Sequence, residues 1–141
     1  MDKKELRIGN YVKYNGSVVS VYAISNPTPS KDKHFNNKAR VTLWCNGLMD
    51  ATIDEIEPIP ITEELVLKIG FKKDVDANNR YRYVIDNCMF EIRLWDSGTL
   101  IKLENYCEDC VRKVHLPKTP NLHQLQNAYY LLTGKELEIK L

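Results

Sequence analysis

The sequence lacks a long hydrophobic run. No apolar stretch approaches the roughly 20 residues that a membrane-spanning helix requires. The segment from Met1 to Arg7 is rich in charge and has no apolar core of the kind that secretory signal peptides carry. We therefore expect a cytoplasmic protein that does not associate with a membrane, and we expect its four cysteines to be reduced.

Catalytic patterns are also missing. The chain has three histidines, and its six glycines fall at predicted turns and helix ends rather than in a phosphate-binding loop. The sequence offers no paired carboxylates and no Ser-His-Asp or Cys-His-Asn combination. We therefore expect a protein that is not an enzyme and that carries no cofactor.

Neither sign of charge is in excess. The 20 lysines and arginines are balanced by 19 acidic residues, so the formal net charge is +1. Proteins dedicated to nucleic acids usually carry a basic excess, because neutralised phosphates supply most of their affinity. The balance argues against such a protein, although we keep nucleic-acid binding through a local basic patch as an alternative. The apolar content of 43% and the charged content of 28% are typical of a folded domain.

The first part of the chain contains a regular pattern of short strands. Asn15-Gly16 and Asn46-Gly47 each separate two runs of strand-forming residues. Asn-Gly readily takes positive φ at both central residues of a tight hairpin turn, so we expect a two-residue turn at each pair. We also expect a long polar loop, one helical turn and a short edge strand, over residues 26–38, 53–57 and 58–61.

This order of elements resembles the SH3-like barrels of Tudor and ribosomal-protein-type modules, and it predicts such a barrel over residues 1–61. In those modules an aromatic cluster can hold a methylated cation. The aromatic residues of this barrel are Tyr11, Tyr14, Tyr22 and Trp44. A small barrel also needs large side chains to fill its core, and we favour that role for these four.

The second part, residues 62–141, predicts a helix, a sheet and a second helix. Thr62 can cap a helix that ends at Gly70. Short turns separate four expected strands, so the sheet should be an antiparallel meander. The strands are expected at residues 81–86, 88–95, 99–106 and 110–116. Apolar residues at helical spacing predict a helix over 121–133, and alternation predicts a last strand over 137–141. The fold class is therefore α+β.

Three segments resemble a family of small bacterial proteins that are associated with phages or other mobile elements. These segments are residues 5–12, 58–64 and 123–137. The resemblance implies a cytoplasmic bacterial protein with a mobile-element origin. We know of no activity or catalytic residue assigned to that family, so none is carried over to this chain.

The face of the sheet that points away from the helices is the leading binding candidate. If Phe90 and Ile92 face the helices, strand alternation turns Arg93 and Trp95 outward. A tryptophan beside arginines can anchor a protein partner or stack on bases. We predict a protein-binding face that contains Trp95, Arg93, Arg82 and Lys102. Two alternatives stay open: a nucleic-acid-binding accessory protein, which the outward acids Glu91 and Glu104 disfavour, and a solvated charged face with Trp95 packed under a loop.

Cys107 and Cys110 form the only C-x-x-C pair. Thiolates at this spacing can bind zinc, and Cys88, His115 or His123 could complete a tetrahedron. Structural zinc sites usually contain two such pairs, and this chain has one. The sequence favours two reduced cysteines beside a turn and no metal, with a small zinc-binding protein as the remaining alternative.

Overall fold

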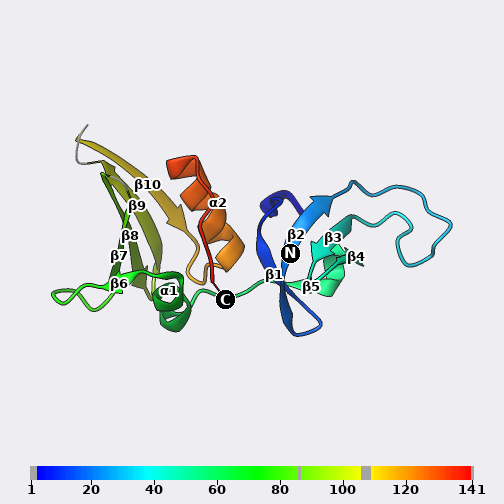
Figure 1. The fold of residues 1–141 in the computed structure, drawn as a ribbon, viewed down its shortest axis with the longest axis horizontal. Coiled ribbons are helices and arrows are strands. Elements are labelled where there is room, and N and C mark those ends of the chain that lie inside the picture. Colours follow the sequence, from blue (N-terminus) through cyan, green and yellow to red (C-terminus); the bar gives the residue numbers. More distant parts are fainter. Residues whose placement is uncertain (1–2, 86, 106–108, 141) are drawn as a thin grey trace. The chain divides into compact units, whose positions relative to one another are not determined.

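The computed structural model describes residues 3–85, 87–105 and 109–140. The chain divides into two compact units, residues 1–59 with 121–123 and residues 60–120 with 124–141. Each unit contains one five-stranded antiparallel sheet, and two α-helices complete the structure (Figure 1). The expected α+β class is confirmed. In the described ranges, no helix is long and apolar enough to cross a membrane.

The first sheet is open and follows the order β4-β3-β2-β1-β5. Its elements are η1 (Lys3–Glu5), β1 (Tyr11–Tyr14), β2 (Ser17–Ile24), β3 (Arg40–Trp44), β4 (Leu48–Thr52), η2 (Ile53–Glu55) and β5 (Ile56–Glu57). Inward-facing β-branched and leucine side chains form its core, with Val12, Val41 and Leu43 fully buried. Among the described strands, β4 and β5 are the two edges, so the expected barrel is not closed. The two-residue β5 pairs only with β1 and is too short to bridge the gap.

The two Asn-Gly turns differ. Asn15 and Gly16 have φ of 49° and 78° and join β1 to β2 directly, which confirms the first two-residue turn. At the second hairpin, strand pairing ends at Trp44 and Leu48, so three residues, 45–47, form the connection. The Cys45 N–H donates to the carbonyl of Gly47 at 3.0 Å inside this connection. The expected two-residue turn there is wrong, although the hairpin itself is present.

The last strand of the first sheet lies earlier than expected. Residues 26–38 form the predicted loop, and η2 supplies the predicted helical turn. However, the edge strand is Ile56–Glu57 rather than residues 58–61. Pro58 and Pro60 have no N–H to donate, so the chain leaves the sheet where they begin.

The second sheet is a meander in the order β10-β9-β8-β7-β6. Its elements are α1 (Glu63–Ile69), β6 (Lys72–Lys73), β7 (Arg80–Ile85), β8 (Cys88–Trp95), β9 (Gly98–Asn105), β10 (Cys110–Leu116) and α2 (Leu122–Thr133). The four expected strands are confirmed, but β6 makes the sheet five-stranded rather than four-stranded. The Leu65 N–H donates to the Thr62 hydroxyl at 3.2 Å, and Gly70 ends α1 with φ of 115°. The predicted caps of α1 are therefore confirmed.

The helices cover one face of the second sheet. Phe90, which is fully buried, lies 4.9 Å from the ring of Tyr129 in α2 and 5.9 Å from the ring of Phe71, which follows α1. The predicted apolar side of α2 is buried at Leu122, Leu125, Tyr129 and Leu132. The strand expected at the end of the chain is not formed over residues 137–140. Leu137 alone is buried there, and no described strand pairs with this segment.

We predict that α2 stabilises the second unit through Leu125. This side chain is fully buried, so Leu125→Ala should lower the free energy of unfolding by about 2–5 kcal/mol, the cost of a buried leucine truncation. Leu131, on the same helix, is 73% exposed and provides the matched control. Urea unfolding followed by circular dichroism measures both changes. Equal effects of the two substitutions would contradict the assigned packing of α2.

Candidate binding face on the second sheet

Cationic side chains line up across all five strands on the face opposite the helices. Residues directly opposite one another in paired strands point to the same face. One such row, which we call the central row, consists of Lys72, Arg82, Glu91, Lys102 and Lys113. The neighbouring row consists of Arg80, Arg93, Leu100 and His115. We call these two rows, together with Trp95, the open face.

A buried carboxylate organises the centre of the open face. Glu91 is only 1% exposed, although it points away from the helices. Its Oε1 lies 2.5 Å from Arg93 Nε, and its Oε2 lies 3.5 Å from Arg82 Nε. A carboxylate this buried needs charged partners to offset its lost hydration. Glu91 therefore holds the two guanidinium groups on either side of it.

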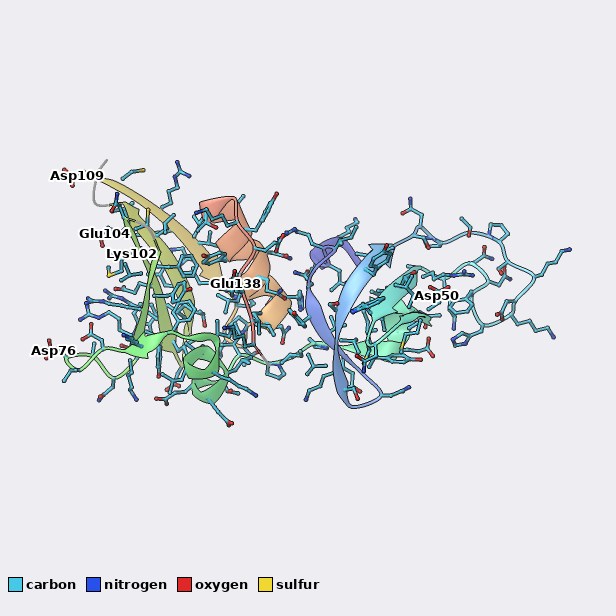
Figure 2. All side chains as sticks on the ribbon, viewed as in Figure 1. Asp50, Asp76, Lys102, Glu104, Asp109 and Glu138 are labelled. Atoms are coloured by element: carbon cyan, nitrogen blue, oxygen red, sulfur yellow. The ribbon has the colours of Figure 1, made fainter. Side chains whose placement is uncertain are left out.

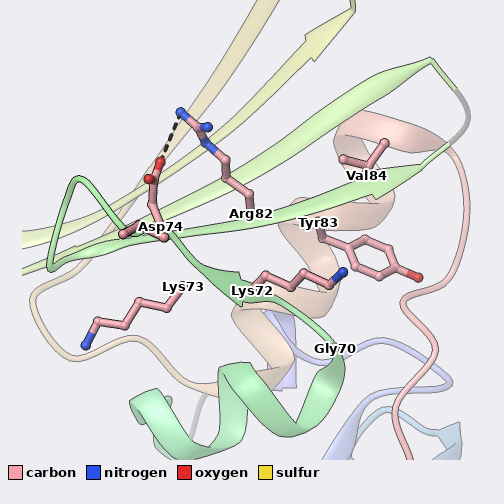
Figure 3. A pocket seen from close by; sticks show the side chains of 8 residues that line it. Gly70, Lys72, Lys73, Asp74, Arg82, Tyr83 and Val84 are labelled. Carbon is pink, nitrogen blue, oxygen red and sulfur yellow. Dashed lines mark ion pairs between the residues drawn. The ribbon is translucent and has the colours of Figure 1, made fainter.

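Asp74 holds the arginines of β7 from the end of β6. Its Oδ2 lies 2.6 Å from Arg80 Nε. The same oxygen lies 3.2 Å from a terminal nitrogen of Arg82, an ion pair that is drawn in Figure 3. The backbone N–H of Asp76, followed by Arg80 and Arg82, lowers the pKa of Asp74 below its ordinary value. Arg82 thus lies between two carboxylates, Asp74 and Glu91.

Charge is segregated onto the open face. The second unit as a whole has twelve basic and twelve acidic residues. The two rows contain six of the basic residues, whereas Glu91, Asp74 and Glu104 are the acids on or beside them, an excess of three positive charges. Lys102 Nζ lies 3.3 Å from Glu104 Oε2 (Figure 2). Lys72 and Lys113 are exposed and form no ion pair within residues 3–85, 87–105 and 109–140.

The four residues predicted from the sequence all lie on the open face. Trp95 ends β8 and is 41% exposed, and the guanidinium carbon of Arg93 lies 6.0 Å from its ring centre. Arg82 and Lys102 flank Glu91 in the central row. Sequence reasoning missed the role of Glu91, which it placed in solvent. The sequence did contain a signal for this role, because Arg93 lies two residues after Glu91 on β8 and therefore on the same side of the strand.

An open hollow extends the open face at its β6 edge. Its volume is about 520 Å³, and its lining includes Lys72, Arg82 and the 67% exposed Val84 (Figure 3). The hollow exists because β6 pairs with only two residues of β7, Arg82 and Tyr81. Lys73 and Asp74 also line the hollow, so it offers an apolar spot beside three cations and one carboxylate.

The candidate zinc ligands do not form a site in the described part of the chain. Cys107 lies outside the described residues. Cys88 and Cys110 are opposite the same residue of β9, so they share one end of the sheet. His115 lies five residues beyond Cys110 on β10, about 17 Å away at the rise of an extended strand. Among the described residues, no three potential ligands cluster together.

The remaining candidate ligand, His123, is fully buried in the first unit. Its Nε2 lies 3.5 Å from Glu5 Oε2. Burial is the largest influence on its pKa, which is lowered because desolvation disfavours the charged imidazole. This histidine therefore has a local carboxylate neighbour rather than cysteines around it.

The aromatic residues of the first sheet divide into two groups. Tyr14 packs against the core, as expected. Tyr22 and Trp44, by contrast, are 54% and 52% exposed. The expectation that both would fill the core is wrong, because they point outward from β2 and β3 while valines and leucines fill the interior.

We predict that Glu91 stabilises the second sheet more than Glu104 does. Glu91→Gln removes a buried charge between two arginines and should cost about 1–3 kcal/mol in unfolding free energy. Glu104→Gln is the control, because its carboxylate is half-buried rather than fully buried and solvent-accessible ion pairs contribute about 0–1 kcal/mol. Urea unfolding measures both values. A smaller loss for Glu91→Gln than for Glu104→Gln would contradict the role assigned to the buried carboxylate.

The chain was compared with known proteins in three ways. No protein-family model, curated protein or solved structure matches it. The resemblances to SH3-like barrels and to phage-associated bacterial proteins therefore stay predictions. The geometry of the open face is the basis for the function that we propose.

Proposed function

We propose that this chain is a non-catalytic binding protein whose open face binds an acidic segment of a protein partner. The observation that carries this proposal is the row of cationic side chains across β6–β10, on the face opposite the helices. The strand order β4-β3-β2-β1-β5, with a 3₁₀ turn before the last strand, supports an SH3-like first unit. The resemblance of three sequence segments supports a phage or mobile-element origin and a cytoplasmic location.

A protein partner suits the chemistry of the open face better than a nucleic acid does. Arg82 and Arg93 are already oriented by Glu91, and fixed guanidinium groups match carboxylates in geometry as well as charge. Tryptophan and arginine are also the residues that contribute most to protein–protein affinity. Trp95 is the only aromatic ring of the open face apart from the imidazole of His115, whereas single-stranded nucleic acids usually stack on several rings.

The charge segregation adds a kinetic advantage. A cationic face on a unit with no net charge attracts acidic partners to one side of the molecule and repels basic ones. Attraction of this kind weakens as salt screens the charges. Binding through the open face should therefore depend on ionic strength.

We predict that the double substitution Lys72→Ala and Lys113→Ala weakens binding to poly-L-glutamate by about tenfold or more, because two exposed cations of the central row are lost. Trp95→Ala should weaken it further while leaving the melting temperature nearly unchanged, since the ring is 41% exposed. Fluorescence anisotropy of the labelled polymer measures the affinity. Lys68→Ala with Lys118→Ala, two exposed lysines outside the open face, is the matched control.

Two results would contradict the proposed function. One is an equal loss of affinity in the control pair, which would show that only net charge matters. The other is an oligonucleotide that binds more tightly than the acidic polymer and loses that affinity in the chain with Lys72→Ala and Lys113→Ala, which would favour the nucleic-acid alternative for the open face. Loss of folding in Trp95→Ala would place that ring in the core instead of at the interface.

A further inference from the structure

The outer face of the first sheet presents aromatic and aliphatic side chains to solvent. Tyr11, Ser20, Trp44 and Leu48 lie opposite one another across β1–β4 and so share one face. Tyr22 lies at a bulge in β2, where the register shifts between Val21 and Ala23. Trp44 and Leu48 are 52% and 56% exposed, and Ser20 beside Trp44 is small. We call Tyr22, Trp44 and Leu48 the aromatic face.

The loop over residues 26–38 is fixed at one end of this face. The Phe35 ring lies 4.3 Å from the guanidinium carbon of Arg40, and Arg40 points to the same side of β3 as Trp44. His34 Nε2 lies 3.0 Å from Glu55 Oε2, and the Asn37 N–H donates to the carbonyl of Thr28 at 3.0 Å. These contacts hold the loop about 13 Å along β3 from Trp44, the length of four extended residues.

This loop contains three lysines and one acid, Asp32, so it carries an excess of two positive charges. Lys31, Lys33 and Lys38 are exposed and form no ion pair with any residue that the structure describes. The neighbouring carboxylates already have partners. Asp50 contacts Arg40 and accepts from the Thr42 hydroxyl, and Glu55 accepts from the Thr52 N–H and hydroxyl. Asp32 accepts the His34 N–H. The loop therefore offers cationic charge beside exposed aromatic rings.

We infer that the aromatic face and the loop together bind single-stranded nucleic acid. Tyr22 and Trp44 stack on bases, and the three loop lysines neutralise phosphates of the same strand. A single strand is required because the faces of paired bases are covered by their neighbours in a duplex. This site lies in the first unit and uses none of the residues of the open face, so it is independent of the proposed function.

Two features separate this surface from the open face. On the open face, carboxylates occupy the arginines and only one aromatic ring apart from the His115 imidazole is available. Here two aromatic rings are half exposed and the lysines carry no partner among the described residues. Proteins that bind single-stranded nucleic acid combine aromatic rings, which stack on any base, with cationic side chains that are free to contact phosphates.

The test is a fluorescence titration with oligothymidylate. It uses the full chain with Trp95→Phe, which leaves Trp44 as the only tryptophan. Stacking on Trp44 should quench its emission as the oligonucleotide is added. The logarithm of the binding constant should fall with the logarithm of the salt concentration with a slope of about −2, as expected when three lysines contact phosphates of a single strand.

Substitutions then locate the site, with anisotropy of a labelled oligothymidylate as the readout. Tyr22→Ala and Trp44→Ala should each weaken binding by about tenfold or more, because a stacked base is lost. The triple change of Lys31, Lys33 and Lys38 to Ala should bring the salt slope close to zero. The control triple change of Lys68, Lys118 and Lys140, all exposed in the second unit, should leave affinity and slope unchanged.

Four outcomes would overturn the inference. The first is the absence of quenching at low salt, and the second is equal binding of a duplex of the same length. The third is unchanged affinity in Tyr22→Ala and Trp44→Ala chains that melt at the temperature of the parent chain. If poly-L-glutamate displaces the oligonucleotide as readily as unlabelled oligothymidylate does, the surface recognises only negative charge, and the stacking role is wrong.

Discussion

The ion pairs of Glu91 are the interaction on which the second sheet and its proposed function both depend. The two helices bury one face of this sheet. The opposite face is in contact with solvent and therefore carries polar side chains, but the residues at its centre are still closely packed. Glu91 meets both conditions, because its carboxylate is 1% exposed and its oxygens lie against Arg82 and Arg93. The same contacts that offset its desolvation fix the guanidinium groups at the surface. Stability and binding geometry therefore have one origin.

The two units present different chemistry to their surroundings. The second unit has no net charge, yet its cations gather on the open face around oriented arginines and Trp95. The first unit exposes Tyr22 and Trp44 from its sheet and lysines from a loop that Phe35 and His34 hold in place. In both units a sheet with one buried face leaves the other face available, and the residues on that face decide which partner suits it.

Much of this architecture could be predicted because local patterns determine it. Alternation predicted β7–β10, helical spacing predicted α2, and Thr62 and Gly70 predicted the ends of α1. The features that were not predicted have physical causes. Lys72–Lys73 is too short and too polar to show a strand pattern, and it forms β6 only by pairing with β7. The burial of Glu91 depends on arginines from two strands, so only the register of the sheet reveals it. Pro58 explains why β5 ends at Glu57, but closure of the first sheet also requires pairing between strands far apart in the sequence, which no local rule sets.

Zero-length carbodiimide cross-linking in extracts of cells that naturally contain the protein, followed by mass spectrometry, tests the central claim most directly. The reagent joins a lysine amine to a carboxylate only where the two are in contact, so each link reports both the surface and the chemistry of the partner. The account predicts that acidic segments of one partner become linked to Lys72, Lys102 and Lys113, and that Glu91→Gln alters these links. Links concentrated at Lys68, Lys118 or Lys140, with none on the central row, would contradict it.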